Sequence, residues 1–81
     1  MLSRRFQFRL KRARAVRGLS QRELSMLAGF SPGHVQHLET GRSEHVRLGD
    51  IEKLARVLRV APEWLAFGVG AGPTIKRKGS K

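Results

Sequence analysis

Apolar side chains recur along residues 6–67 with the three- and four-residue spacing of helices that pack against a core. They form five groups: Phe6, Leu10 and Ala13, continued by Arg17; Leu24, Leu27 and Ala28; Val35 and Leu38; Ile51, Leu54, Ala55 and Leu58; Trp64, Leu65 and Phe67. No segment alternates apolar and polar residues with the period of two of a half-buried strand. The pattern therefore predicts an all-α fold of five helices without a sheet.

Glycine, proline and serine mark the expected ends of these helices. The expected stops are Gly18, Gly29, Gly41 and Gly68. Ser20 and Glu23 have the spacing of a capping box, which predicts that the second helix begins just after Ser20. Ser31 followed by Pro32 predicts a capping serine and the first residue of the third helix, and Pro62 opens the fifth.

The composition changes after the fifth helix. Residues 69–81 are rich in glycine and lysine and offer few apolar side chains to bury, so we predict a flexible basic tail there. Residues 1–68 then form one small domain, folded over about residues 5–67, and 81 residues leave room for little more.

Charge narrows the class of partner. The chain has 17 Lys and Arg against 6 Asp and Glu, which gives a formal net charge of +11. The mutual repulsion of so many positive charges is costly unless the chain binds a polyanion. Nucleic acid is the expected partner, with an anionic membrane surface as the rival. No apolar run is long enough for a membrane span or a secretory signal, and the absence of cysteine excludes thiolate metal sites and cysteine nucleophiles. We expect neither an enzyme nor a cofactor.

The most informative stretch is residues 20–41, two short capped helices joined by a tight turn at Gly29 and Phe30. Such a pair predicts a helix-turn-helix, whose second helix fits the major groove of DNA. Four segments resemble the Cro/C1-type, lambda-repressor-like helix-turn-helix family of phage and bacterial transcriptional regulators: residues 19–24, 28–31, 35–41 and 51–58. Residues 61–65 resemble the closing helix of many members, so that the resemblance covers about residues 10–68.

The resemblance implies roles for particular residues. Gln21 matches a glutamine that binds phosphate and braces the recognition helix, and Arg14 and Glu39 match an internal ion pair between the first and third helices. Arg47 matches an arginine that some members insert toward the minor groove. Phosphate or minor-groove contacts are thus expected from Gln21, Arg22, Ser31, Arg42, Ser43 and Arg47.

The third helix departs from the commonest pattern of this family. Base-contacting residues usually cluster at its start, but Pro32 and Gly33 have no side chain that can hydrogen-bond to a base. Pro32 can still touch a thymine methyl group, and Gly33 permits close approach of the backbone. Base contacts are therefore expected from Pro32, Gly33, His34, Gln36 and His37, with modest specificity for each half-site.

Other interpretations of these residues stay open. His34, His37 and His45 could hold a metal, although exposed histidines that face DNA or solvent are preferred because no cysteine or acid lies among them. The arginines of the first helix could form only a solvated face. Trp64 and Phe67 could belong to the core or its edge, or to a dimer interface.

We therefore predict a sequence-specific regulator of transcription that binds double-stranded DNA in the bacterial cytoplasm or nucleoid. The expected mechanism is repression by a homodimer on a palindromic operator, with half-sites about 34 Å apart. Two alternatives remain: an antitoxin-type protein that binds a partner protein as well as DNA, and a non-specific nucleic-acid-binding protein.

Overall fold

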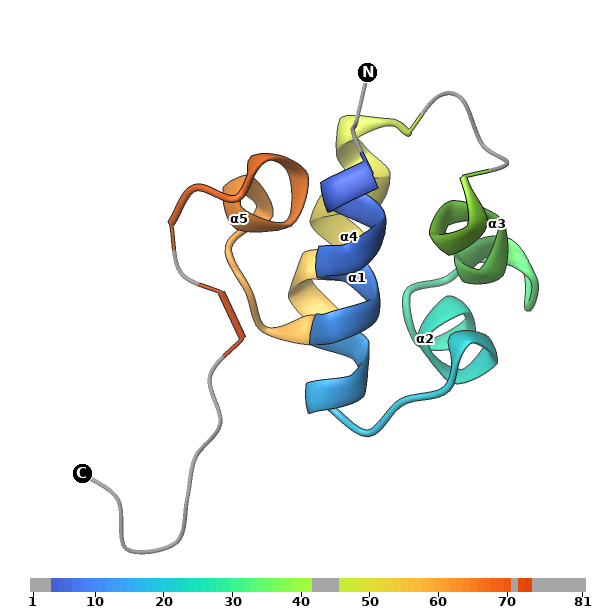
Figure 1. Ribbon diagram of the computed structural model, residues 1–81. Coiled ribbons are helices and arrows are strands. Elements are labelled where there is room, and N and C mark those ends of the chain that lie inside the picture. Colours follow the sequence, from blue (N-terminus) through green and yellow to red (C-terminus); the bar gives the residue numbers. More distant parts are fainter. Residues whose placement is uncertain (1–3, 42–45, 71, 74–81) are drawn as a thin grey trace, which may run out of the picture.

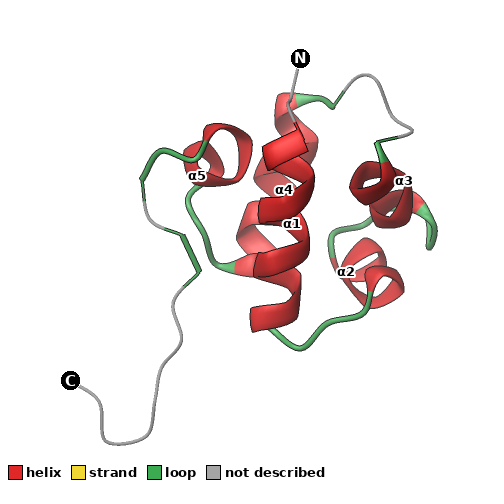
Figure 2. Ribbon diagram, viewed as in Figure 1, coloured by secondary structure: helices red, strands yellow, loops and turns green. Residues whose placement is uncertain are grey.

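The computed structural model describes residues 4–41, 46–70 and 72–73, and these contain five helices and no strand (Figures 1 and 2). The helices are α1 (Arg4–Val16), α2 (Gln21–Leu27), α3 (His34–Thr40), α4 (Leu48–Leu58) and α5 (Pro62–Phe67). The all-α, five-helix prediction is confirmed for this part of the chain. None of the described helices is long and apolar enough to cross a membrane.

The helices are arranged around α1 and α4, which lie one in front of the other in Figure 1. The α2–α3 pair lies on one side of them and α5 on the other, and both α3 and α5 pack against α1. One core joins all five helices, and its buried apolar residues are Phe6, Leu10, Ala13, Leu24, Ala28, Val35, Leu38, Ile51, Leu54, Ala55, Leu58, Leu65 and Ala66. This arrangement holds α3 at the edge of the molecule with one side buried.

Most helix ends follow the expected local chemistry. The capping box is present, because the Ser20 hydroxyl accepts a hydrogen bond from the Glu23 N–H while Glu23 Oε1 accepts one from the Ser20 N–H. Gly41 and Gly68 are left-handed at the ends of α3 and α5, with φ of 77° and 79°. Glycine adopts this conformation without a Cβ clash, so both stops fall where the sequence predicts.

One apolar position of α2 is wrong in the sequence analysis. Leu27 is 62% exposed rather than buried with Leu24 and Ala28. Ser25 is fully buried in its place. Because Ser25 turns inward, the buried face of α2 is centred on residues 24, 25 and 28, and at 100° per residue position 27 lies outside it.

Candidate nucleic-acid interface

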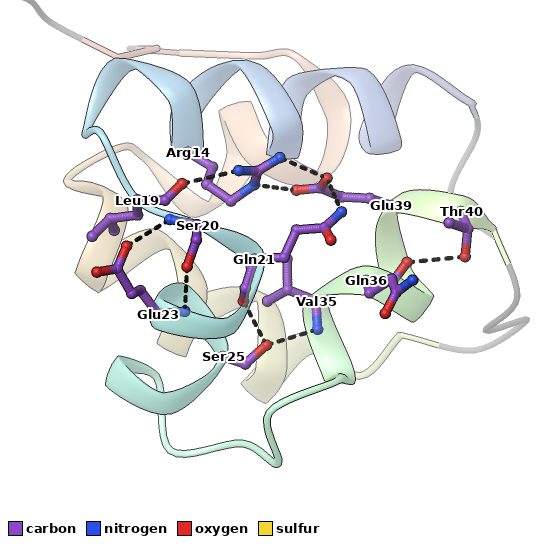
Figure 3. A network of polar contacts seen from close by, with 10 residues as sticks. All are labelled: Arg14, Leu19, Ser20, Gln21, Glu23, Ser25, Val35, Gln36, Glu39 and Thr40. Carbon is purple, nitrogen blue, oxygen red and sulfur yellow. Dashed lines mark hydrogen bonds and ion pairs between the residues drawn. The ribbon is translucent and has the colours of Figure 1, made fainter.

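Glu39 is the polar centre that fixes α3 to the rest of the domain (Figure 3). Its carboxylate accepts hydrogen bonds from Arg14 Nε at 2.7 Å, from Arg14 Nη2 at 3.0 Å and from Gln21 Nε2 at 2.9 Å. The side chain of Glu39 is 4% exposed and that of Arg14 is 15% exposed, so the pair is largely shielded from water. Arg14 Nη1 also donates to the carbonyl of Leu19. The two residues that the resemblance paired are therefore in contact, and α1, α2 and α3 meet at one carboxylate.

The start of α3 is set by a side chain from another helix. Ser25 Oγ of α2 accepts a hydrogen bond from the Val35 backbone N–H at 2.9 Å and donates to the Gln21 carbonyl. The expectation that Ser31 caps α3 and that Pro32 is its first residue is wrong. The helix begins at His34. Its N-cap residue is Gly33, which has no side chain that could cap the helix. Because Ser25 satisfies an N–H at the start of α3, residues 31–33 are free to form a turn instead.

The outer face of α3 presents Gln36 and His37 to solvent. Figure 3 shows Thr40 one turn further along, where its hydroxyl donates to the Gln36 carbonyl at 2.9 Å. Neither the Gln36 amide nor the His37 ring is hydrogen-bonded to another described side chain. A solvent-facing amide and imidazole on a braced helix are groups that can hydrogen-bond to base edges.

His34, by contrast, packs inward at the start of the helix. Its ring lies on that of Phe30, with ring centroids 4.3 Å apart and planes tilted by 31°. Its Nε2 atom is buried and has no hydrogen-bond partner among the described residues. On α4, Lys53 Nζ lies 5.6 Å from the centroid of the Phe30 ring. The enclosed Nε2 of His34 differs from Gln36 and His37, which are exposed; that His34 contacts a base stays a prediction.

The other candidate DNA contacts lie on α2, in the turn before α3 and on either side of the loop that leads to α4. Arg22, Ser31, Pro32 and Arg47 are exposed, and Gly33 is partly exposed. Gln21 is half-buried with its amide held by Glu39, so that one N–H of this amide remains for another acceptor. Arg42 and Ser43 lie outside the described residues.

Arg9 of α1 and Arg17, which follows that helix directly, have a structural role that sequence reasoning missed. Arg9 donates from Nε and Nη2 to the carbonyls of Leu65 and Ala66 in the last turn of α5, at 3.0 and 2.8 Å. Arg17 Nε donates to the carbonyl of Leu58, the last residue of α4, at 2.8 Å. With Arg14, two arginines of α1 and the arginine that follows this helix are thus engaged within the domain. This result corrects the interpretation of the α1 arginines as only a solvated face.

The helical wheel carried a signal for these contacts. Arg17 continues the buried stripe of Phe6, Leu10 and Ala13, and Arg9 and Arg14 flank that stripe on either side. Burial, and to a lesser degree the like charge of Arg5, lowers the pKa of Arg9. The side chain nevertheless stays protonated at neutral pH, as arginine does in proteins.

The two aromatic residues of α5 differ in their surroundings. Trp64 is half-buried and packs against the core. Gly72 lies close to it, since a Cβ added there would come within 2.8 Å of the indole Cε2. Phe67 is 69% exposed, so it is not a core residue, and Val69 beside it is 64% exposed. Of the tail that the sequence predicts, residues 71 and 74–81 lie outside the described part.

A metal site finds no support in the described residues, which contain no group of three histidine, cysteine or acidic side chains that could hold an ion. His34 and His37 face different surroundings, and His45 lies outside the described part of the chain.

Comparison with known proteins agrees with the geometry. Residues 6–66 match the family model described as a helix-turn-helix domain. The chain is 38% identical over 66 residues to the HTH-type transcriptional regulator PrtR of Pseudomonas aeruginosa, a match that covers 82% of this chain and 25% of that protein. The chain thus corresponds to about a quarter of the length of this relative.

Two solved structures share the fold. The N-terminal DNA-binding domain of SinR from Bacillus subtilis matches with a TM-score of 0.72 at 25% identity, over 78% of this chain and 91% of the other. The restriction-modification controller protein C.AhdI from Aeromonas hydrophila matches with a TM-score of 0.69 at 38% identity, over 74% of this chain and 89% of the other. The braced α2–α3 pair, the family match and these neighbours agree: the chain belongs to the Cro/C1-type helix-turn-helix family of transcriptional regulators.

Proposed function

We propose that this domain binds double-stranded DNA sequence-specifically and represses transcription as a homodimer on a palindromic operator. The observation that carries the proposal is the braced recognition helix: α3 is fixed through Glu39 and Ser25 while Gln36 and His37 face solvent. A rigid helix with exposed polar side chains can be inserted into the major groove without further ordering cost. PrtR is an HTH-type transcriptional regulator, and the SinR domain is a DNA-binding domain, which supports the same role here.

In this proposal α3 enters the major groove and α2 crosses the DNA backbone. Gln36 pairs with adenine through its amide, and His37 donates to or accepts from a purine edge. Pro32 and Gly33 bring the turn before α3 close to the DNA, where Pro32 meets a thymine methyl group. Phosphate and minor-groove contacts come from Gln21, Arg22, Ser31, Arg42, Ser43 and Arg47.

The second N–H of the Gln21 amide is well suited to a phosphate. One N–H donates to Glu39, which fixes the orientation of the amide plane. The other can therefore donate to a phosphate oxygen without a new conformational cost. The same side chain would then brace α3 and fix how deeply this helix enters the major groove.

The exposed end of α5 supports the homodimer. Phe67 and Val69 are 69% and 64% exposed, next to the half-buried Trp64. Exposed apolar side chains that lie together often mark a surface that contacts another protein. The same surface favours the antitoxin-type alternative, in which a partner protein rather than a second copy covers Phe67.

Selection of bound duplexes from a random-sequence DNA pool, at about 150 mM salt, tests the proposal. A palindromic consensus whose half-sites are about ten base pairs apart is the expected result. Selected and scrambled duplexes should then differ in affinity by about 10³-fold or more. Binding without any enrichment would leave charge alone to account for the affinity and would favour the non-specific alternative. Enrichment of a single half-site would contradict the dimer but not the role of α3.

A further inference from the structure

The side of α1 that faces away from the core carries an exposed aromatic residue. Phe8 is 64% exposed, although phenylalanine is among the residues that proteins bury most often. At about 100° per residue, Phe8 lies on the opposite side of the helix from Phe6 and Leu10, which belong to the core. The register of α1 therefore fixes the exposure of Phe8, because the helix cannot bury this ring without exposing its core residues.

Basic side chains surround Phe8 on this side of α1. Residues three and four positions apart are neighbours on a helix, and the neighbours of Phe8 at these spacings include Arg5, Lys11 and Arg12. All three are exposed, as is the small Ala15 two turns after Phe8. None of the 13 residues of α1 is acidic. We call Arg5, Phe8, Lys11, Arg12 and Ala15 the outer face of α1.

The outer face is separate from the two surfaces that the proposed function uses. Figure 1 shows α4 behind α1, with the α2–α3 pair on one side and α5 on the other. From α1, Arg14 reaches Glu39 of α3, and Arg9 reaches carbonyls at the end of α5. On the helical wheel the outer face lies between these two directions, on the side away from the core. It therefore coincides neither with the recognition helix nor with the exposed end of α5.

The chemistry of the outer face selects its occupant. A helix that lies on a membrane needs a broad apolar face, whereas this face has one large apolar side chain. The backbone of a DNA duplex offers phosphates to the basic residues but no apolar surface to Phe8. A second copy of the chain has the same net charge of +11 and lacks an excess of carboxylates. An acidic protein segment supplies both the negative charge and the apolar side chain.

We propose that the outer face of α1 docks an acidic helix of a partner protein, which packs an apolar side chain on Phe8 and places carboxylates beside the basic residues around it. A convex helix face is suited to another helix, because the ridge of side chains on one packs into the groove of the other. Sites for single-stranded nucleic acid differ, since several aromatic side chains line a basic groove there. The docking does not depend on the proposed function, and a partner on this face leaves α3 accessible to DNA.

The test measures binding of the full 81-residue chain to a labelled helical peptide by fluorescence anisotropy. The peptide has about 15 residues, enough to span the outer face, with leucines on one side flanked by glutamates. Phe8→Ser keeps the charge and should weaken binding about tenfold. The matched control is Leu27→Ser, which removes an apolar side chain of similar exposure (62%) from α2 and should leave the affinity unchanged.

A second pair of variants tests the charges. Lys11→Gln combined with Arg12→Gln should weaken binding of the peptide about fivefold. Lys53→Gln combined with Arg56→Gln removes the same charge from exposed positions of α4 and should have a much smaller effect.

A wild-type chain that does not bind the peptide, or losses that follow net charge alone with no effect of Phe8→Ser, would overturn the proposal. So would a labelled oligothymidine of about 15 nucleotides that Phe8→Ser weakens while the peptide is unaffected, because the face would then bind single-stranded nucleic acid. If circular dichroism shows that Phe8→Ser does not fold, the wild-type chain decides. Its backbone amides, followed by NMR, should shift most at Phe8, Lys11 and Arg12 when the peptide is added, and shifts centred on another helix would overturn the inference.

Discussion

Replacing Glu39 by alanine removes three hydrogen bonds at once and leaves the Arg14 guanidinium without its carboxylate. Two of these bonds come from Arg14, at 2.7 and 3.0 Å, and one from Gln21, at 2.9 Å. Loss of one partner of a buried ion pair costs about 3–5 kcal/mol. We expect the lower end, about 3 kcal/mol, because Arg14 is 15% exposed and keeps its bond to the Leu19 carbonyl.

The size of the domain converts this cost into a large thermal shift. In domains of 60–100 residues, 1 kcal/mol corresponds to about 4–8 °C in Tm, so Glu39→Ala should lower Tm by about 12–24 °C. Urea and thermal unfolding followed by circular dichroism measure both quantities. The matched control is Glu52→Ala, an exposed acid that forms no ion pair with another described residue, and this variant should stay within about 0.5 kcal/mol of wild type.

A double-mutant cycle isolates the pair itself. Arg14→Met combined with Glu39→Leu removes both charges and fills similar volume, so the double variant should be more stable than the sum of the single losses predicts by about 1–3 kcal/mol. Specific DNA binding by Glu39→Ala should persist well below its melting temperature. Additive losses, or a Glu39→Ala cost below about 1 kcal/mol, would refute the reasoning that this carboxylate holds α3 in place.

Four further substitutions test other parts of the account. Ser25→Ala leaves the buried Val35 N–H without a partner and should cost about 2 kcal/mol in urea unfolding, whereas a neutral effect would show that the cap is dispensable. His37→Ala should relax base preference in a selected-duplex panel without changing the salt slope, and an equal loss for every duplex would contradict the placement of α3. Arg22→Ala should weaken all duplexes alike and reduce the salt slope by about one, unless its side chain lies away from phosphate. Phe67→Ser should raise the dimer dissociation constant in sedimentation equilibrium while Tm changes little; an unchanged association would move the dimer interface elsewhere.

The sequence predicts those features that depend on neighbours along the chain. The buried stripe of α4, the capping box at Ser20 and the left-handed stop at Gly41 each follow from residues within one or two turns. The order of these local signals also carries the resemblance to the Cro/C1-type family. Local chemistry was therefore enough for the fold class and for the location of the helix-turn-helix.

Features that depend on contacts between helices could not be predicted from local patterns. The start of α3 was misplaced because its cap comes from Ser25, ten residues earlier and on another helix. Arg9 and Arg17 bond to carbonyls more than forty residues away, at helix ends that come close only in the folded domain. The inward turn of His34 depends likewise on Phe30 and on α4 beside it.

The most direct test of the central claim follows the backbone amides of the isotope-labelled chain by NMR while a 20-base-pair duplex carrying the selected consensus is added. The account predicts that the largest shift changes fall on Ser31 and residues 33–37, in the turn before α3 and its first residues, and on Gln21 and Arg22 at the start of α2. Amides in the middle of α4 should stay nearly unchanged. Changes centred on the outer face of α1 or on α4, with α3 unaffected, would contradict the claim that α3 is the recognition helix.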